Sequence, residues 1–252
     1  MTHSRESILN ALKTNEFIPY YQPVIHSGNG KVAGCEILAR WHSQSDGIVE
    51  AGKFIASVTE HGFLQEMTKM LMKKTHFDFS QQRNSQCDFF TTINVDLHLL
   101  MSAEFRNKLI CFCHKLRNEG VRLIAEITEH ENVNEYKMAR RELKKLAKAG
   151  VDFAVDDFGT GYANEDLLQV SQAKIIKIDK KYAQNPECEV SDFFLQETVR
   201  LAKNYHAQVV IEGIENHEQE RKAKMSGVDY LQGFLYSRPL PFEHFNHALS
   251  FY

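Results

Sequence analysis

The sequence lacks any apolar run long enough to cross a membrane. No stretch approaches the roughly 18 to 20 apolar residues that span a bilayer, and Met1 to Ser7 contain no apolar signal-peptide core. We therefore expect a cytoplasmic protein whose residues make no membrane contact. The sequence also fits the cytoplasmic domain of a membrane-anchored protein, because Met1 shows only where this chain begins.

Cysteine is scarce, and its spacing excludes two structural roles. Five cysteines occur, an odd number without a C-x-x-C pair: Cys35, Cys87, Cys111, Cys113 and Cys188. This pattern is typical of reduced thiols in a reducing compartment and argues against a disulfide scaffold. The twelve histidines contain no H-E-x-x-H pattern, so neither residue type indicates a zinc site.

The chain has little excess charge of either sign. Its formal net charge is -3, whereas a protein that coats a nucleic acid backbone needs clustered Lys and Arg to displace counterions. We therefore expect no nucleic acid polymer as a partner. An anionic ligand has to be met by local groups.

The residues that are present suit a folded core. Hydrophobic residues make up 43% of the chain and no polar low-complexity tract occurs. A length of 252 residues fits either two small domains or one (β/α) barrel. No linker rich in Pro, Gly or Ser divides the chain, so we expect a single domain over residues 1–252.

Short β-rich runs alternate with stretches of helical periodicity, which predicts a βα repeat. The six runs are Asp88 to Val95, Val121 to Thr128, Asp152 to Phe158, Lys174 to Asp179, Ala207 to Ile214 and Tyr230 to Tyr236. The helical stretches are Ala103 to Asn118, Glu135 to Ala149, Ser191 to Asn204 and Asn216 to Met225. Gly120, Gly150 and Gly227 follow three of these helices, as helix-ending glycines do.

Two earlier β-rich runs differ in their connection. Phe17 to Ile25 and Lys31 to Trp41 are joined by only five residues, whereas a parallel crossover needs a dozen or more. They should form an antiparallel hairpin. Together with the six later runs they give eight strands, which predicts an α/β fold: a (β/α)₈ TIM-like barrel with one antiparallel strand near the start. A doubly wound open sheet is the alternative.

Polar residues interrupt these strands, although strands covered on both faces should be almost continuously apolar. They lie in or near the ends of successive strands: Glu36, Asn94, Glu126, Asp156, Asp157, Lys177, Glu212 and Gln232. In a parallel barrel those ends converge on the one face where active sites form. We therefore expect these side chains to meet in space.

Five of these residues are carboxylates, which repel one another unless a cation neutralises them. Oxygen ligands without Cys or His favour a hard divalent ion such as Mg²⁺ or Mn²⁺. The pair Asp156-Asp157 suits the bridging of two such ions, an arrangement used for phosphodiester displacement. Each residue alone also fits a plainer role: Glu36 a salt-bridge partner, Lys177 a surface lysine, Gln232 a turn residue. Their joint placement favours a site.

The ordered motifs resemble the EAL family of bacterial cyclic di-GMP phosphodiesterases from about Phe17 to Pro241. The matching segments are Tyr21-Gln22-Pro23, Glu36-Ile37-Leu38-Ala39-Arg40-Trp41, Asn94, Glu126-Ile127-Thr128-Glu129, Asp156-Asp157-Phe158-Gly159-Thr160-Gly161, Lys177-Ile178-Asp179, Glu212-Gly213-Ile214-Glu215 and Gln232-Gly233-Phe234. The resemblance implies hydrolysis of cyclic di-GMP to linear 5′-pGpG by two Mg²⁺ or Mn²⁺ ions, in a chain that forms a homodimer.

The resemblance also implies a role for each matching residue. One metal would be held by Glu36, Asn94, Glu126 and Asp156, and a second by Asp156, Asp157 and Glu212. Lys177 would position the attacking water, so we expect Lys177, Glu212 and Glu36 to be catalytic. Substrate-binding candidates are Arg40, Gln22, Leu38 and Gln232. Glu129 would brace the loop after Asp157, which in this family links the catalytic centre to the dimer interface.

The sequence departs from the family pattern in three places. Asp96 and His130 stand where small hydroxyl residues are common, and Ala163-Asn164-Glu165-Asp166 replaces a loop where Ser and Leu are usual. None of these changes removes an expected ligand. The alternative function is a silent receptor or protein-binding domain, since degenerate members bind the nucleotide or a partner without hydrolysis. Degeneracy would show as lost ligands, whereas here every expected position is filled.

Overall fold

The computed structural model describes residues 3–81, 89–128, 133–159, 164–184 and 189–249. The strands are β1 (Phe17–His26), β2 (Val32–Ser43), β3 (Gly47–Glu50), β4 (Phe90–Asn94), β5 (Arg122–Thr128), β6 (Asp152–Phe158), β7 (Ile175–Ile178), β8 (Gln208–Ile211) and β9 (Tyr230–Leu231). The helices are α1 (Arg5–Lys13), α2 (Ala51–Glu60), α3 (Leu64–Ser80), η1 (Leu99–Met101), α4 (Ala103–Asn118), α5 (Val133–Lys148), α6 (Asn164–Ser171), α7 (Lys181–Gln184), α8 (Glu189–Asn204), α9 (His217–Met225) and α10 (Phe242–Leu249).

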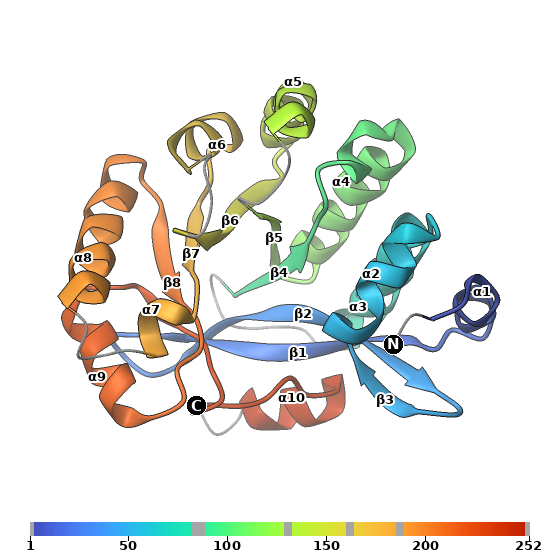
Figure 1. The fold of residues 1–252 in the computed structure, drawn as a ribbon, viewed down its shortest axis with the longest axis horizontal. Helices are drawn as coiled ribbons and strands as arrows, with labels where there is room; N and C mark the ends of the chain where they lie inside the picture. The colour runs from blue at the N-terminus through green and yellow to red at the C-terminus, as the bar shows by residue number, and fades with distance from the viewer. Residues whose placement is uncertain (1–2, 82–88, 129–132, 160–163, 185–188, 250–252) are drawn as a thin grey trace.

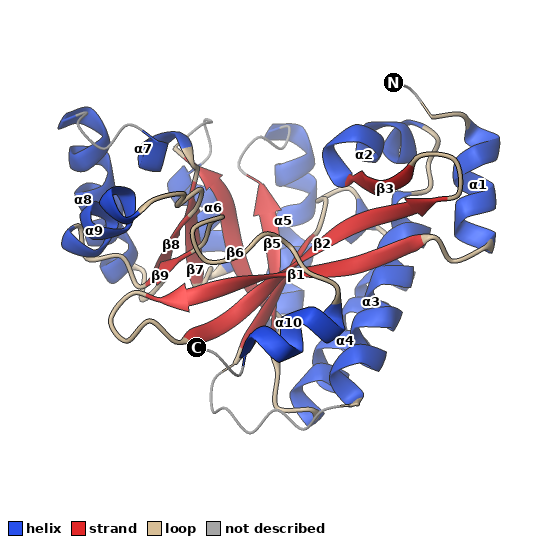
Figure 2. Ribbon diagram, turned by 90° about the horizontal axis from the view of Figure 1, so that it is seen from below, coloured by secondary structure: helices blue, strands red, loops and turns tan. Residues whose placement is uncertain are grey.

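Eight of these strands close into a barrel. Their order is β1-β9-β8-β7-β6-β5-β4-β2, and pairing of β1 with β2 completes the ring, while β3 pairs with β2 outside it. β1 runs antiparallel to both of its neighbours, and the six pairs from β2–β4 to β8–β9 are parallel. Helices α4, α5, α6 and α8 lie around the outside of the strands (Figures 1 and 2). The closed barrel and its reversed strand are confirmed, and the open-sheet alternative is wrong.

The hairpin of β1 and β2 has the expected antiparallel register, with Gln22 opposite Glu36. The other edge of β2 pairs in parallel with β4, from Gly34 to Ile37. Gly34 permits this close approach, because a side chain there would collide with the backbone oxygen and the ring of Phe90. The glycine is therefore required by packing between the two strands.

One apolar layer fills the barrel interior, with one residue from nearly every strand. Its members are Val24, Phe90, Ile124, Ala154, Ile175, Val210 and Tyr230. A larger apolar cluster fills the space between the strands and the surrounding helices. Because side chains alternate between the two faces of a strand, the residue two positions further along each strand also points into the barrel. The next layer is therefore fixed by the register of this one.

Several elements were not predicted from the sequence: α1, β3, α2, α3, η1, α6, α7 and α10. The last strand is also shorter than predicted, since β9 ends at Leu231 and not near Tyr236. The backbone of Gly233 lies so close to Ile214 that a side chain there would collide with main-chain atoms, and this contact replaces the strand ladder. Among the described residues, none of the helices combines the length and the apolar composition needed to span a bilayer.

Candidate active site

A layer of polar side chains lies directly above the apolar layer of the barrel. Each of its members stands two positions from a residue of the apolar layer or, on β2, from Gly34. The members of this polar layer are Gln22, Glu36, Thr92, Glu126, Asp156, Lys177, Glu212 and Gln232. The residues from which they are counted are, in the same order, Val24, Gly34, Phe90, Ile124, Ala154, Ile175, Val210 and Tyr230. On the reversed β1 the count runs backward along the chain. Nearly all of these side chains are buried. The alternation of each strand thus brings together residues that are up to 210 positions apart.

Lys177 is the centre of this layer. Its side chain is 2% exposed, and its Nζ forms ion pairs with four carboxylates. The distances to Nζ are 2.7 Å from Glu212 Oε1, 2.9 Å from Glu126 Oε1, 3.3 Å from Glu36 Oε2 and 3.5 Å from Asp156 Oδ1. The structure therefore contradicts the plainer interpretation of Lys177 as a surface lysine.

Amide groups hold Glu36 in place. Asn94 Nδ2 donates to Glu36 Oε1 at 3.1 Å, and Gln232 Nε2 donates to Glu36 Oε2 at 2.7 Å. Gln232 Nε2 also donates to Gln22 Oε1 at 3.3 Å. Nε2 of Gln22 in turn donates to the backbone oxygen of Ser237. The amides fix the carboxylate orientation and keep one edge of the site neutral.

A second group of carboxylates gathers at the mouth of the barrel. Asp156, Asp157 and Glu212 each offer an oxygen, and these oxygens lie within 4.8 Å of one another. Asp157 has a φ of 54°, a left-handed conformation uncommon for a non-glycine residue, and its backbone N–H donates to Asp156 Oδ1 at 2.9 Å. Because such strain persists where surrounding structure imposes it, this turn aims two adjacent carboxylates at one place.

The electrostatics of the layer follow from burial. Burial raises the pKa of Glu126 well above its usual value, and Glu36 and Asp156 add to the rise although Lys177 opposes it. For Glu212 burial raises the pKa to about 8, again against the effect of Lys177. Burial alone would lower the pKa of Lys177, but the surrounding carboxylates outweigh it and raise that pKa. The lysine is therefore charged, whereas the Glu126 and Glu212 carboxyls bind a proton more readily than exposed carboxyls do.

The donor atoms fit divalent metal ions. Both carboxylate oxygens of Glu126 are buried, and Oε1 is paired with the ammonium of Lys177. One ammonium among four carboxylates leaves the layer strongly acidic. Carboxylate and amide oxygens without thiolate or imidazole are the ligands of Mg²⁺ or Mn²⁺. The site can thus hold hard cations, and the predicted ligand sets remain predictions.

These pKa shifts predict how stability depends on pH. A carboxyl whose pKa is raised by folding binds its proton more tightly in the native state, so stability falls as pH rises from the unfolded value toward the folded one. For Glu212 this window runs from 4.5 to about 8. Lys177 stays protonated in both states below its usual pKa of 10.5 and changes nothing there. We expect the metal-free chain to lose on the order of 2 kcal/mol between about pH 6.5 and about pH 8.5 from Glu212 alone.

Thermal unfolding with and without Mg²⁺ at those two pH values measures this effect. Mg²⁺ should raise the melting temperature more at the higher pH, because fewer protons compete for the same oxygens. Glu212→Gln should reduce the pH dependence of the metal-free chain. An equal Mg²⁺ effect at both pH values would show that protons and metal do not share these carboxylates.

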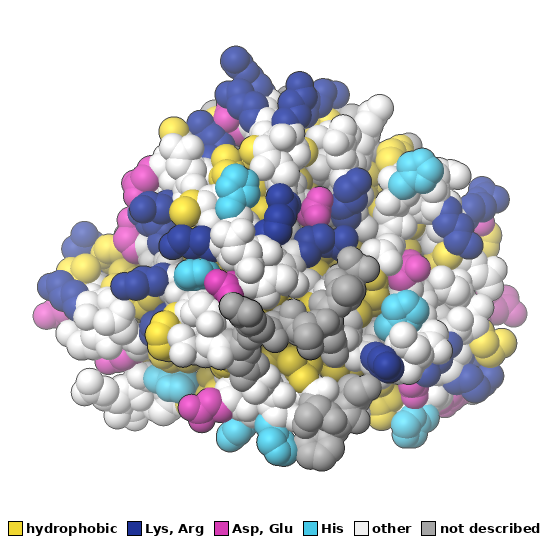
Figure 3. Space-filling model, turned by 180° about the vertical axis from the view of Figure 1, so that it is seen from behind, with side chains coloured by type: hydrophobic (Ala, Val, Ile, Leu, Met, Phe, Trp, Pro, Cys, Tyr) yellow, Lys and Arg dark blue, Asp and Glu magenta, His cyan; other side chains and the backbone are white. Residues whose placement is uncertain are grey.

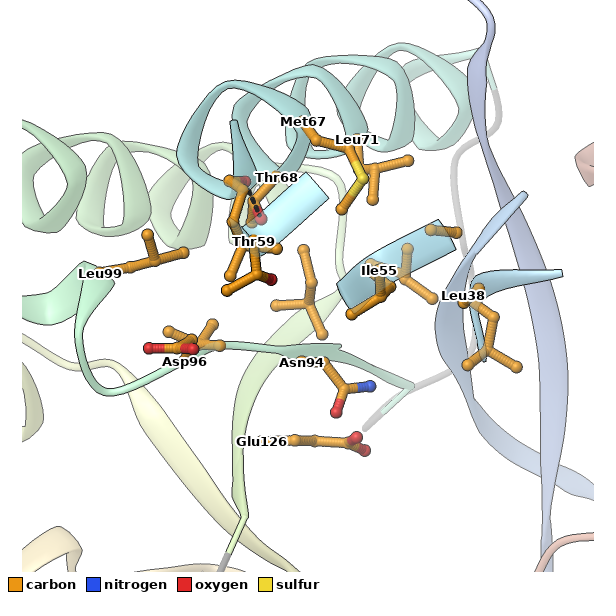
Figure 4. Close-up of a pocket in the computed structure, with 16 residues that line it drawn as sticks. Leu38, Ile55, Thr59, Met67, Thr68, Leu71, Asn94, Asp96, Leu99 and Glu126 are labelled. Atoms are coloured by element: carbon orange, nitrogen blue, oxygen red, sulfur yellow. Dashed lines mark hydrogen bonds between the residues drawn. The ribbon is translucent and has the colours of Figure 1, made fainter. Parts of the chain in front are cut away.

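Two cavities open beside the polar layer. One, of about 360 Å³, reaches the acidic residues and is lined by Gln22, Glu36, Leu38, Asn94, Asp156, Lys180, Gln184, Glu212, Gly213, Glu215, Gln232, Gly233 and Phe234. The other, of about 330 Å³, has mostly apolar walls from α2, α3, β2 and β4, with Asp96 and Glu126 among its lining residues (Figure 4). Leu38 and Asn94 line both. A ligand with charged and apolar parts can therefore occupy the two together.

One predicted residue, Arg40, lies outside both cavities, and another, Glu129, is not described. Arg40 lines neither cavity; its guanidinium donates to the backbone oxygen of Ala39 at 2.8 Å and lies over the ring of Tyr20. Glu129 falls outside the described residues, as does His130. Asn164–Ser171 forms α6, so the segment expected as a loop is helical from Asn164 onward. The predicted roles of Arg40 and Glu129 stay predictions.

The structure adds lining residues that the sequence did not single out. Lys180, Gln184 and Phe234 come from turns and a short helix next to the strand ends, a placement that no strand pattern reveals. Gly213 brings Lys180 close: with a φ of 71°, it has no side chain to collide with Cβ of Lys180. Glu215 could have been found from the sequence as the last residue of the Glu212 motif.

Known proteins are similar to this chain over most of its length. Residues 5–239 match the EAL domain. This chain belongs to the EAL domain family. It is 35% identical over 238 residues to the cyclic di-GMP phosphodiesterase PdeL of Escherichia coli strain K12, covering 94% of this chain and 66% of PdeL. It is 28% identical over 236 residues to the probable cyclic di-GMP phosphodiesterase PdeB of the same strain, covering 94% and 45%. The EAL chain thus spans less than two thirds of these relatives.

Solved structures of EAL domains have the same fold. An EAL domain protein from Listeria monocytogenes EGD-e superposes with a TM-score of 0.82 at 26% identity, covering all of both chains. The PaMucR phosphodiesterase, solved as a c-di-GMP complex, superposes with a TM-score of 0.85 at 24% identity, covering 95% of this chain and 98% of the other. At 24% identity, the similarity to the PaMucR phosphodiesterase shows only that the two chains share the barrel fold.

Proposed function

We propose that this EAL domain is a metal-dependent phosphodiesterase that hydrolyses cyclic di-GMP to linear 5′-pGpG. The observation that carries the proposal is the buried ammonium of Lys177 among four carboxylates, beside the group formed by Asp156, Asp157 and Glu212. The names of the relatives PdeL and PdeB point to the same substrate. Two Mg²⁺ or Mn²⁺ ions would supply Lewis acidity and lower the pKa of the attacking water.

The remaining roles belong to residues of the chain. One ion would be held by Glu36, Asn94, Glu126 and Asp156. The other would be held by Asp156, Asp157 and Glu212. Lys177, charged and able only to donate, would orient the attacking water and stabilise the charge on the phosphoryl oxygens. A bond forms from the water oxygen to phosphorus while the bond to the ribose 3′ oxygen breaks. The 3′ oxygen gains a proton, and the product carries a 5′ phosphate.

The cavities suit the two parts of a cyclic dinucleotide. The acidic cavity would take the scissile phosphate, with Gln22 and Gln232 in its wall. Arg40 lies outside this wall, and its contact with a substrate phosphate is what the family resemblance implies. The apolar cavity would take one guanine, stacked near Leu38, with Asp96 accepting hydrogen bonds from the N1 and N2 groups of the base. Adenine offers neither donor on that edge. The site should therefore select guanine over adenine.

An assay of nucleotide products tests this function against the receptor alternative. The purified chain with Mg²⁺ should convert cyclic di-GMP to linear pGpG, separated by chromatography, and should leave cyclic di-AMP intact. Tight calorimetric binding of cyclic di-GMP without any product would identify a silent receptor instead. Equal cleavage of both dinucleotides would contradict the guanine role of Asp96.

We also propose that the chain forms a homodimer through α8. Val190 and Phe193 are 72% and 66% exposed, and their spacing places them on one face of the helix. The next residue, Phe194, stacks on Tyr182 at 3.9 Å between ring centroids, and the Tyr182 hydroxyl donates to the backbone oxygen of Gly159. This chain of contacts joins the exposed face to the turn after Asp157.

Phe193→Glu is expected to lower the dimer fraction and, through that turn, the turnover. Analytical ultracentrifugation and product formation measure the two effects. The matched control is Phe77→Glu, because Phe77 is similarly exposed at 63% but lies on α3. If both variants sediment like the unchanged chain, α8 is not the interface.

We place this activity in the cytoplasm. Cys35, Cys111 and Cys113 are free thiols, which suits a reducing compartment. Glu129 would brace the turn after Asp157, as the family resemblance implies.

A further inference from the structure

One outer face of α5 carries a strip of basic side chains. Its members are Arg140, Arg141, Lys144, Lys145 and Lys148, all exposed, and together they line one depression of the surface. They cover an arc of about 140° around the helix and about 12 Å along it, at roughly 100° and 1.5 Å per residue. Lys and Arg gather at the top of Figure 3, the edge that α5 occupies in Figure 1. We call this set the basic strip.

Little of this charge is neutralised within the described residues. Glu142 is the acidic side chain beside the strip, and it pairs with Lys145 at 2.7 Å and with Arg106 at 3.0 Å. No ion pair joins Arg140, Lys144 or Lys148 to a residue whose side chain is described. Like charges four residues apart on a helix repel each other, so this arrangement reduces helix stability slightly. An anionic partner would remove that cost.

The strip continues beyond the end of the helix. Exposed Arg117, at the end of α4, donates from its guanidinium to the backbone oxygen of Gly150 at 2.9 Å. Gly150 lies two residues after Lys148 and two before β6 begins. The strip therefore runs toward the amino-terminal ends of the strands, whereas Asp156 and Asp157 lie at the opposite end of β6.

We propose that the basic strip docks this domain on an anionic lipid surface. α5 lies on the outside of the barrel, so a flat surface can approach all five side chains (Figure 1). The large exposed apolar side chains among the described residues are Ile48, Phe77, Met101, Val190, Phe193, Met225 and Phe234, and none is on residues 139–148, the part of α5 whose side chains are described. Binding is therefore electrostatic, without insertion into the acyl layer. The barrel mouth stays open to solution.

Lipid is favoured over a nucleic acid for two reasons. Proteins that bind single strands interleave their cations with aromatic side chains on which bases stack, and the described part of the strip has none. Specific reading of a duplex needs side chains that reach base edges, whereas this face presents only long cations on a convex helix. A plane of lipid head groups requires neither feature.

Sedimentation with vesicles tests the proposal on the whole chain. The chain should pellet with phosphatidylcholine vesicles that contain phosphatidylglycerol, and not with phosphatidylcholine alone. High salt should release it, because exposed charges are screened. Each Lys or Arg close to such a surface strengthens partitioning by about fivefold, so Arg140→Ser, Lys144→Ser and Lys148→Ser together should weaken it about 100-fold.

The matched control changes the net charge equally on other faces. Lys31→Ser, Lys53→Ser and Lys203→Ser together remove three exposed cations and should leave binding nearly unchanged. Circular dichroism confirms that both triple variants are folded. Equal weakening by both variants would overturn the proposal, since net charge alone would then explain binding. Binding to duplex DNA without binding to vesicles would also overturn it, in favour of a nucleic acid partner.

Discussion

Replacement of Lys177 by alanine is expected to lower turnover of cyclic di-GMP by on the order of 10²-fold or more, with affinity changed by roughly tenfold at most. The ammonium matters most when charge redistributes around the attacked phosphorus. The ground-state complex would keep its contacts with the bound ions and the surrounding polar groups. A misplaced water, by contrast, loses the in-line geometry on which displacement depends.

The surroundings of Lys177 make a second variant necessary. Alanine both removes the charge and leaves space inside a buried layer, where four carboxylates then face one another. Lys177→Met keeps the length of the side chain, so a loss shared by both variants belongs to the charge. Their melting temperatures in Mg²⁺ show whether each site remains assembled.

Single-turnover hydrolysis and calorimetric titration separate the two effects of Lys177. The titration uses Ca²⁺ in place of Mg²⁺ to suppress cleavage. Equal losses of rate and affinity would make Lys177 a binding residue. If neither quantity changes, its ion pairs are purely structural.

Most of the site could be predicted because strand alternation is a local rule with a long-range result. Polar residues such as Glu126 and Lys177 stand two positions beyond buried apolar residues, and closure of the barrel brings them together. The sequence could not give the contacts within the layer. That one ammonium meets four carboxylates depends on barrel register and side-chain length, which no single strand encodes.

The missed elements have physical reasons. On α3 the buried face includes Thr68 and Thr75, so polar residues interrupt the apolar periodicity that predicts a helix. β3 has only four residues, three of them exposed, and it exists because β2 extends beyond the barrel to pair with it. β9 contributes two residues whose pairing with β8 and β1 closes the ring. Such short strands form because neighbouring strands pair with them, and their own sequence pattern does not predict them.

The helices that were predicted illustrate the opposite case. Ala103–Asn118 has the predicted bounds, and its first turn is capped by the Ser102 hydroxyl. His217–Met225 starts one residue after its prediction because Asn216 is the N-cap of a capping box with Gln219. Local hydrogen bonding sets these boundaries, so the sequence reveals them.

The net charge of the chain illustrates a limit of composition. A formal charge of -3 argues against a nucleic acid polymer as a partner, but composition averages over the whole surface. The structure places five exposed cations together on α5. Local clustering, which depends on helix phase, decides whether an anionic surface can bind.

Removal of divalent metal is expected to abolish hydrolysis completely, the largest effect in this account. The carboxylates that would hold the ions repel one another, the pKa values of Glu126 and Glu212 are raised, and the ammonium of Lys177 neutralises one charge. Ca²⁺ should occupy the same oxygens but inhibit, because its larger and looser coordination positions the attacking water poorly.

The most direct measurement is the yield of linear pGpG from cyclic di-GMP after treatment with EDTA and readdition of single metals. We expect no product in EDTA, full recovery with Mg²⁺ or Mn²⁺, and inhibition when Ca²⁺ is added to the Mg²⁺ enzyme. Undiminished production of pGpG in excess EDTA would contradict a metal-dependent phosphodiesterase at this site.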